Sequence, residues 1–215
     1  VSTNLAVASA QAGVPTLLLD LDPQQSTLRW GSWRERTQPS TKAPLIVQAA
    51  GLDNIAERIE AAKSRGVKLV IIDTPPAASA ESDLAARAAQ LVLVVVQPSI
   101  IDLSTLTETF SLKWVASRPA FVVFNRAPTQ GTTLADAQRL VAGQGYRLSD
   151  KVLHDRSAYR TAPIDGLGVT ESDAKSAAAS EVKALYHWAK GILGKKAAPD
   201  PLKFESDDLM EGIER

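Results

Sequence analysis

Residues 15–30 read PTLLLDLDPQQSTLRW and carry the most specific pattern in the chain. The uninterrupted apolar run from Leu17 to Leu19 is typical of a strand that is buried on both faces of a parallel sheet. Asp20 and Asp22 follow this run, and helical periodicity begins after them. Ligands of open α/β sheets bind outside the carboxyl ends of the strands. The stretch therefore predicts a buried strand that ends at a polar ligand site.

Four further apolar runs have the same character, since they are rich in Val, Ile and Leu and show little polar alternation. They span residues 44–47, 68–73, 91–96 and 120–125. Helical periodicity covers residues 1–11, 24–36, 52–65, 81–89, 103–116, 134–143 and 171–193. Strands that alternate with helices predict an α/β fold, with a doubly wound, mostly parallel sheet and helices on both of its faces.

One domain accounts for this pattern. A chain of 215 residues is long enough for a single sizeable core, and no second domain boundary is evident within residues 1–194. Residues 195–215 begin with KKAAPDP and continue into an acidic segment. We expect them to form a linker and a mobile tail.

Composition excludes several classes of protein. The absence of cysteine rules out disulfides and thiolate metal sites, and two scattered histidines, His154 and His187, argue against a zinc enzyme. The 24 basic residues balance the 24 acidic ones, so DNA binding would require a local basic patch. An acidic tail disfavours attachment to anionic membranes. Neither a Ser-His-Asp set nor a dinucleotide-binding glycine motif is evident.

A second strand end also carries a carboxylate, Asp73 in LVIIDTPP. Carboxylates at neighbouring strand ends suit Mg²⁺, which binds one or two of them together with water and substrate phosphates. The alternative for Asp20 or Asp73 taken alone is that the side chain caps the helix that follows its strand. Residue type and position do not decide between these two readings.

Taken together, LLLDLDPQQSTLRW and KLVIIDTPP resemble the A′ and Walker B motifs of the deviant Walker ATPases, the ParA/MinD family, and most closely those of the small plasmid-partition ParA proteins. The segments LVLVVVQPSIIDLS, FVVFNR and HDRSAYRTAPIDG are similar to later parts of the same proteins, so the resemblance covers most of residues 1–193. It implies a P-loop NTPase-like fold that binds ATP and Mg²⁺.

The resemblance also implies roles for individual residues. Asp22 would orient the attacking water as the catalytic residue, whereas Asp20 and Asp73 would serve Mg²⁺. The nucleotide base would be contacted by Asn125, Arg126, Pro163, Ile164 and Asp165. Arg156 resembles an arginine near the nucleotide or the dimer face. The alternatives are a turn residue for Asn125 and an exposed, solvated side chain for Arg156.

One family feature is absent from these residues. The family begins with a strand and a glycine-rich loop that ends in Gly-Lys-Thr-Thr, ahead of an NLA-like helix, but here VSTNLA opens the chain. Without that loop and its lysines we expect the 215 residues not to hydrolyse ATP. We expect the strand and loop to lie upstream of Val1, because a sheet that lacks a central strand exposes two unpaired edges. The alternative is a P-loop-less, non-hydrolysing interaction module of the same fold.

The function implied by the resemblance is segregation of plasmid or chromosomal DNA by a cytoplasmic, nucleoid-associated ATPase. ATP would drive homodimerisation and nonspecific DNA binding, and a ParB-type or small centromere-binding protein would stimulate hydrolysis. Lys190, Lys195 and Lys196 form a candidate DNA-binding patch, although cations at a helix end also stabilise the helix dipole. A MinD-like regulator or a DNA-transfer accessory ATPase is the alternative within the enzyme class, and no membrane partner is expected.

Overall fold

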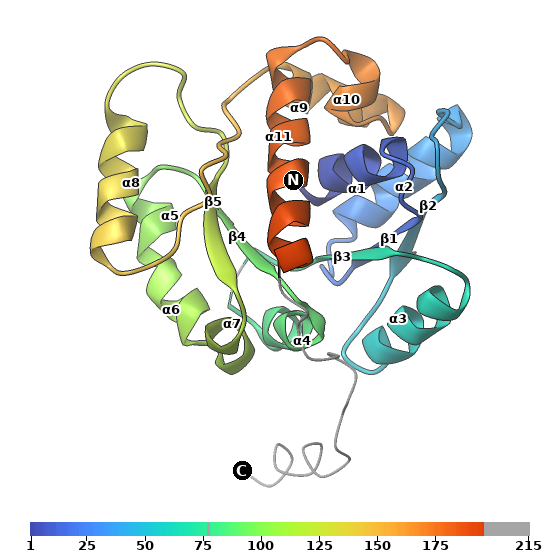
Figure 1. Cartoon of the computed structure of the whole chain (residues 1–215), viewed down its shortest axis with the longest axis horizontal. Coiled ribbons are helices and arrows are strands. Elements are labelled where there is room, and N and C mark those ends of the chain that lie inside the picture. Colours follow the sequence, from blue (N-terminus) through green and yellow to red (C-terminus); the bar gives the residue numbers. More distant parts are fainter. Residues whose placement is uncertain (77, 196–215) are drawn as a thin grey trace, which may run out of the picture.

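Parallel strands form two sheets in the computed structural model, which describes residues 1–76 and 78–195 (Figure 1). The five strands of this part of the chain are β1 Thr16–Asp20, β2 Leu45–Ala49, β3 Leu69–Asp73, β4 Val92–Val96 and β5 Ala120–Phe124. The helices before β4 are α1 Ser2–Gln11, α2 Ser26–Thr37, α3 Ile55–Ser64 and α4 Ala80–Ala88. Those that follow β4 are α5 Ile100–Ser104, α6 Leu106–Ser111, α7 Lys113–Ser117, α8 Thr133–Gly143, α9 Ala158–Thr161, the 3-10 helix η1 Ala162–Asp165, α10 Val169–Ser172 and α11 Ala177–Lys195.

The predicted fold class, α/β with parallel strands, is confirmed, but the strands are divided between two sheets. One sheet has the order β2-β1-β3 and the other consists of β4 and β5. Strands β3 and β4 therefore lie at sheet edges and do not pair with each other, although their sequences, LVIID and VLVVV, are those of buried central strands. Every residue of β1 is buried, whereas β3 is only half-buried and Val95 of β4 is 40% exposed.

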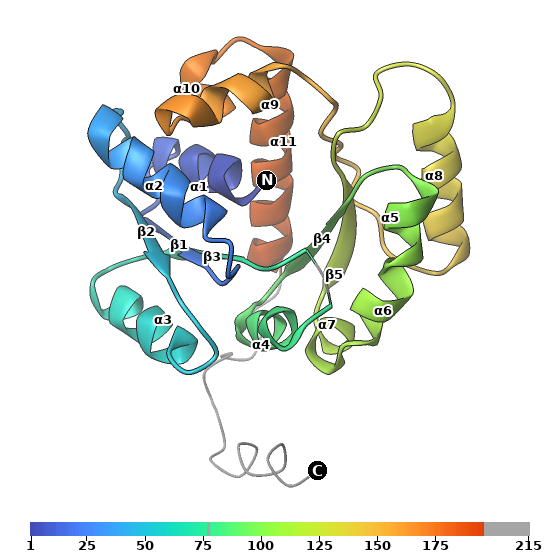
Figure 2. The same ribbon diagram turned by 180° about the vertical axis from the view of Figure 1, so that it is seen from behind.

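Helices cover both faces of the three-stranded sheet. Leu18 packs against Val7 of α1 and Trp30 of α2. Leu17 and Leu19, whose side chains point to the opposite face, pack with residues of α3 and α4 such as Ile55 and Ala85. Seen from behind, α5, α6 and α8 lie beside β4 and β5 at the other side of the molecule (Figure 2). The prediction of helices on both faces is thus confirmed.

Helix α11 packs across both sheets and joins them (Figure 1). Its residues Val182 and Leu185 belong to a core cluster that receives Ile71 from β3, Leu93 from β4 and Val123 from β5. Burial of this apolar surface is what holds the two sheets together on this face. No helix among the described residues is both long enough and apolar enough to cross a membrane.

Two of the predicted helices differ from the structure. The segment predicted as one helix over residues 103–116 is divided into α5, α6 and α7: α5 and α6 meet at Thr105, and Leu112, with ψ 131°, leaves the helical conformation between α6 and α7. The helix predicted over residues 171–193 is interrupted at Asp173, so α10 ends at Ser172 and α11 begins at Ala177. Residues 196–215, which include most of the predicted linker and the acidic tail, lie outside the described residues.

The carboxylate of Glu181 on α11 binds the segment between α8 and α9 and the first turn of α9. Its Oε1 lies 2.8 Å from Nδ1 of His154 and accepts hydrogen bonds from Nε and Nη2 of Arg156, at 2.9 and 2.7 Å. Its Oε2 accepts from the backbone N–H of His154 and from the hydroxyl of Tyr159, each at 3.2 Å. Burial alone would raise the pKa of Glu181, but the hydrogen bonds from Arg156 and His154 outweigh it and lower the pKa.

The contacts of Glu181 with His154, Arg156 and Tyr159 form what we call the Glu181 clamp. The clamp predicts a pH-dependent difference in stability between the wild type and Glu181→Gln. A lowered pKa in the folded state means that the stabilisation is present above the pKa of an unfolded glutamate and is lost as the pH falls through the folded value. We expect Glu181→Gln to lower the free energy of unfolding by about 1–2 kcal/mol at pH 7. That difference should shrink below about pH 4.

Urea denaturation at a series of pH values measures this difference. Glu57→Gln, at an exposed position in the first turn of α3, is the matched control and should change stability by less than about 0.5 kcal/mol. A constant gap between wild type and Glu181→Gln down to about pH 3 would contradict the proposed origin of the effect.

Candidate functional site

Two carboxylates lie side by side at the carboxyl ends of β1 and β3. Asp20 and Asp73 are the last residues of these strands and are paired in the parallel register. Asp20 is 2% exposed, whereas Asp73 is half-buried. The structure therefore brings the two predicted metal ligands together at the sheet edge where α/β proteins bind their ligands.

Asp20 holds the backbone that connects β1 to α2. Its Oδ1 accepts the N–H of Asp22 at 3.0 Å and its Oδ2 accepts the N–H of Leu28, in the first turn of α2, at 2.8 Å. The capping role that the sequence left open is therefore present for Asp20. Burial raises the pKa of Asp20 most, the neighbouring carboxylates of Asp73 and Asp22 raise it further, and the two N–H donors oppose the rise.

Asp73 binds hydroxyl groups from two helices. Its Oδ1 accepts from Oγ of Ser2 at 2.6 Å and its Oδ2 accepts from Oγ1 of Thr27 at 2.5 Å. Ser2 opens α1, so the positive end of the α1 dipole lies next to this carboxylate. Thr27 precedes Leu28, and the paired aspartates thus hold two consecutive residues of α2. Neither hydroxyl was predicted, because serine and threonine in a first helical turn are common and carry no signal of a distant partner.

Asp22 lies in the turn between β1 and α2. Its Oδ1 accepts the N–H of Gln24 at 2.9 Å and its carbonyl accepts the N–H of Gln25 at 2.8 Å. Gln25 has a left-handed backbone with φ 52°, which closes the turn directly before α2. Because Asp20 binds the N–H of Asp22, the position of Asp22 depends on the buried carboxylate two residues earlier.

Asn125 and Arg126 lie at the carboxyl end of the other sheet. The N–H of Asn125 donates to the carbonyl of Val96 at 2.8 Å, which extends the pairing of β4 and β5 by one residue. Arg126 is exposed and has a positive φ of 51°. The following residue, Ala127, pairs with His154, so the Glu181 clamp also supports this strand end.

Pro163, Ile164 and Asp165 belong to η1, which packs against α2. The chain is held there by Arg34, whose Nη1 donates to the carbonyl of Gly166 at 3.1 Å and whose guanidinium also binds Glu171 at 2.8 Å. A Cβ on Gly166 would lie 2.2 Å from the backbone nitrogen of Arg34, and this close approach requires glycine. Ile164 is 69% exposed.

Arg156 and the lysines have different surroundings. The structure pairs Arg156 with Glu181, so the alternative of an exposed, solvated arginine is wrong. Lys190 is exposed on α11, near its end. Lys195 is the last residue of α11, but its side chain and all of Lys196 lie outside the described residues.

The oxygen atoms at Asp73 fit a magnesium ion. Carboxylate and hydroxyl oxygens are hard ligands, and Mg²⁺ is usually held by one or two carboxylates while water and phosphate complete its shell. Within residues 1–76 and 78–195, no group of three or more Asp, Glu, His or Cys side chains could hold a metal ion without such help. The arrangement therefore suits Mg²⁺ that arrives with a phosphorylated ligand.

Sequence comparison identifies the family. Residues 1–169 match the model of the CobQ/CobB/MinD/ParA nucleotide binding domain. The chain belongs to this family. A relative, the maintenance of carboxysome distribution protein A of Gloeobacter kilaueensis, is 29% identical over 185 residues, which are 84% of this chain and 81% of that protein.

Solved structures share the fold. A ParA family ATPase from Chlorobium tepidum has a TM-score of 0.61 at 18% identity, over 86% of this chain and 91% of that one. A chain of the MinC:MinD cell division protein complex of Aquifex aeolicus has a TM-score of 0.67 at 14% identity, over 92% of this chain and 90% of that one. A plasmid partition protein of Borrelia burgdorferi has a TM-score of 0.56 at 14% identity, over 91% and 92%. These similarities confirm the P-loop NTPase-like fold of ParA and MinD proteins that the sequence predicted.

The contact between Thr27 and Asp73 yields a testable coupling. Thr27→Val keeps the shape of the side chain but removes the donor to a half-buried carboxylate, so it should lower the free energy of unfolding by about 1–2 kcal/mol. In a double-mutant cycle with Asp73→Asn, measured by urea denaturation, the two sites should be coupled by about 1 kcal/mol. Thr37→Val, at an exposed position of α2, is the control. Additive effects of the Thr27 and Asp73 substitutions would show that the hydroxyl contributes nothing through Asp73.

Proposed function

We propose that this chain is the larger part of a ParA-type partition ATPase that segregates plasmid or chromosomal DNA. The observation that carries the proposal is the pair Asp20 and Asp73 at registered strand ends, with the positive end of α1 and the first turn of α2 directly beside it. A helix N-terminus next to carboxylates that suit Mg²⁺ is the arrangement expected for a metal-bound polyphosphate. Membership of a nucleotide-binding family supports the same assignment.

The separation of the two sheets supports an additional strand between β3 and β4. Both of these strands are apolar, lie at sheet edges and are only partly buried. We propose that a segment ahead of Val1 supplies this strand together with the glycine-rich loop, whose backbone N–H groups and lysine would bind the phosphates. In the completed sheet the edges of β3 and β4 would be paired.

The carboxylates would then have separate tasks. Asp73, with the hydroxyl of Thr27 beside it, would hold Mg²⁺, which supplies charge neutralisation on the phosphates when it is bound. Asp22 lies in the turn ahead of α2 and would orient the attacking water. Asp20 would keep this turn in place through the N–H groups of Asp22 and Leu28. Its carboxylate, next to Asp73, would also contribute negative charge to the metal site.

Base recognition and assembly complete the proposal. Asn125 and Arg126 end the second sheet and would contact adenine, with Pro163, Ile164 and Asp165 flanking the base from η1. ATP binding would favour a homodimer, and the dimer would bind DNA without sequence specificity through Lys190, Lys195 and Lys196. A ParB-type or small centromere-binding protein would accelerate hydrolysis, and the protein would act in the cytoplasm on the nucleoid.

Calorimetry with ATP and Mg²⁺ tests the nucleotide site. The protein is prepared as the 215 residues and together with any residues that precede Val1 in its reading frame. We expect only the longer protein to bind ATP tightly and to hydrolyse it slowly. In it, Asp22→Asn should leave ATP affinity within about threefold while hydrolysis falls by about 100-fold or more. Asp53→Asn, an exposed aspartate, is the control. A longer protein that binds no ATP would favour the non-hydrolysing interaction module instead.

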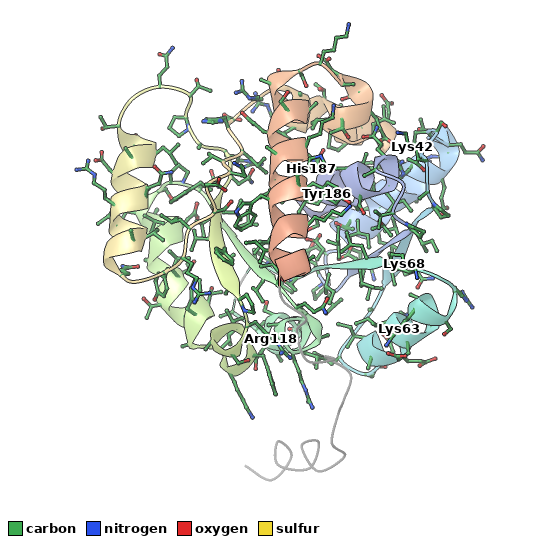
Figure 3. The ribbon with its side chains drawn as sticks, viewed as in Figure 1. Lys42, Lys63, Lys68, Arg118, Tyr186 and His187 are labelled. Carbon is green, nitrogen blue, oxygen red and sulfur yellow. The ribbon has the colours of Figure 1, made fainter. Side chains whose placement is uncertain are left out.

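DNA binding of the ATP-bound protein should be steeply salt-dependent. Removal of three cations by Lys190→Gln, Lys195→Gln and Lys196→Gln should weaken binding and reduce the slope of log K against log salt by about 3. The control removes three other lysines, Lys42, Lys63 and Lys68, which Figure 3 labels on the side of the three-stranded sheet. Fluorescence anisotropy with a duplex of mixed sequence measures both quantities. An equal loss in both triple variants would contradict the assignment of the patch.

A second candidate function is the distribution of a protein cargo. The observation that favours it is the similarity to the carboxysome distribution protein, whose name describes such a role. Deletion of the gene followed by fluorescence microscopy separates the two candidates. Loss of a plasmid from daughter cells supports DNA partition, whereas mispositioning of a protein assembly with normal plasmid inheritance supports the second candidate.

A further inference from the structure

A cleft of about 380 Å³ opens at the amino ends of β4 and β5. It lies at the opposite end of these strands from Asn125, so it is separate from the proposed base contact. Its walls include Phe110 of α6, Arg118 ahead of β5, and Tyr146 and Arg147 from the loop after α8. Figure 3 shows Arg118 at the end of the molecule where α4 and α7 lie. The volume falls within the range of sites for small ligands.

Arg118 is held rigidly at this cleft. Its Nε donates to the carbonyl of Ala86 at 3.3 Å and its Nη2 donates to the carbonyl of Arg87 at 2.6 Å. These are carbonyls at the end of α4, where the helix dipole favours a cation. The guanidinium carbon also lies 5.7 Å from the centre of the Trp114 ring. A guanidinium fixed in this way loses little conformational entropy when it binds a ligand.

The charge of the cleft is not balanced by acidic groups. No aspartate or glutamate belongs to its lining. Within the described residues neither Arg118 nor Arg147 has a carboxylate partner. Four other arginines have one, namely Arg34, Arg139, Arg156 and Arg160. Arg147 is exposed, with its guanidinium carbon 6.0 Å from the centre of the Phe121 ring. Two arginines without a carboxylate partner in the lining of one cleft favour an anionic ligand there.

An aromatic pair adjoins the arginines. The rings of Phe110 and Tyr146 are stacked, with centroids 4.3 Å apart and planes inclined by 17°. Tyr146 remains half-buried and lines the cleft. A planar ring attached to the anion has an aromatic surface to pack against here.

We propose that this cleft binds a phosphorylated ligand, with Arg118 and Arg147 holding the phosphate and Tyr146 contacting the group attached to it. The guanidinium fork of exposed Arg147 matches two phosphate oxygens, whereas Arg118 offers Nη1, which takes no part in its carbonyl contacts, and a phosphate dianion balances the two positive charges. A nucleoside monophosphate has both the anion and the planar ring that the lining accommodates. This site does not depend on the proposed ATPase function, since none of its residues takes part in the Asp20 and Asp73 arrangement.

Calorimetry on the 215-residue protein at low ionic strength tests the site with inorganic phosphate, AMP and a short DNA duplex as probes. We expect saturable binding of phosphate and tighter binding of AMP. Arg147→Ala should weaken both by about tenfold or more, and Arg147→Lys, which keeps the charge but not the fork, should be intermediate. Arg65→Ala, an exposed arginine after α3, is the matched control and should bind AMP within about twofold of wild type.

Arg118→Ala is unsuitable as the only variant, because it removes donors to the end of α4 and can lower stability. Arg147→Ala leaves those contacts in place, and thermal unfolding checks its fold. Binding of the duplex alone, lost in Arg147→Ala, would assign the phosphate site to nucleic acid rather than to a free nucleotide. Absence of saturable binding for all three probes, or equal affinity of Arg147→Ala and Arg65→Ala, would overturn the proposal.

Discussion

Two carboxylates that end neighbouring strands, Asp20 and Asp73, determine the arrangement at the centre of this protein. Parallel pairing places both charges at one edge, and the rest of the site compensates for them. Backbone N–H groups of Asp22 and Leu28 bind one carboxylate, and the hydroxyls of Ser2 and Thr27 bind the other. The cost of burying Asp20 is visible in its raised pKa. A divalent cation at this edge would favour the ionised form, so the same residues are well suited to a metal-bound phosphate.

The second constraint is the division of the strands into two sheets. Helix α11 bridges them through apolar contacts, and its Glu181 binds His154 and Arg156, next to the bridge between His154 and Ala127 at the second strand end. One helix thus contributes to the packing between the sheets and to the position of the second strand end. Strands β3 and β4 are apolar, but at these sheet edges their residues are only partly buried. For this reason the proposed function includes a further strand between them.

Much of the fold followed from the sequence because buried parallel strands have a distinctive composition. The runs that became β1, β3, β4 and β5 were located to within a residue or two, since each is apolar throughout and ends at a polar residue or turn. The helix predicted over residues 103–116 was wrong as a single element, because periodicity continues through Leu112 although its backbone, with ψ 131°, is not helical. Similarly, residues 171–193 have helical composition, but the side chain of Asp173 accepts the N–H of Lys175 and the hydroxyl of Ser176 accepts the N–H of Ala179, so α10 and α11 are separate helices.

The sequence by itself determined the alternation of strands and helices, the family resemblance and the acidic residues at the strand ends, because these depend on local composition and spacing. Tertiary structure alone decided that Asp20 binds backbone while Asp73 binds hydroxyls, that Arg156 pairs with Glu181, and that Arg118 and Arg147 share a cleft without a carboxylate. These contacts join residues that are distant in the sequence, or residues whose partner the sequence does not specify. The partners of such side chains depend on how helices and strands pack in three dimensions. The pattern of apolar and polar residues along the chain contains no information on that packing.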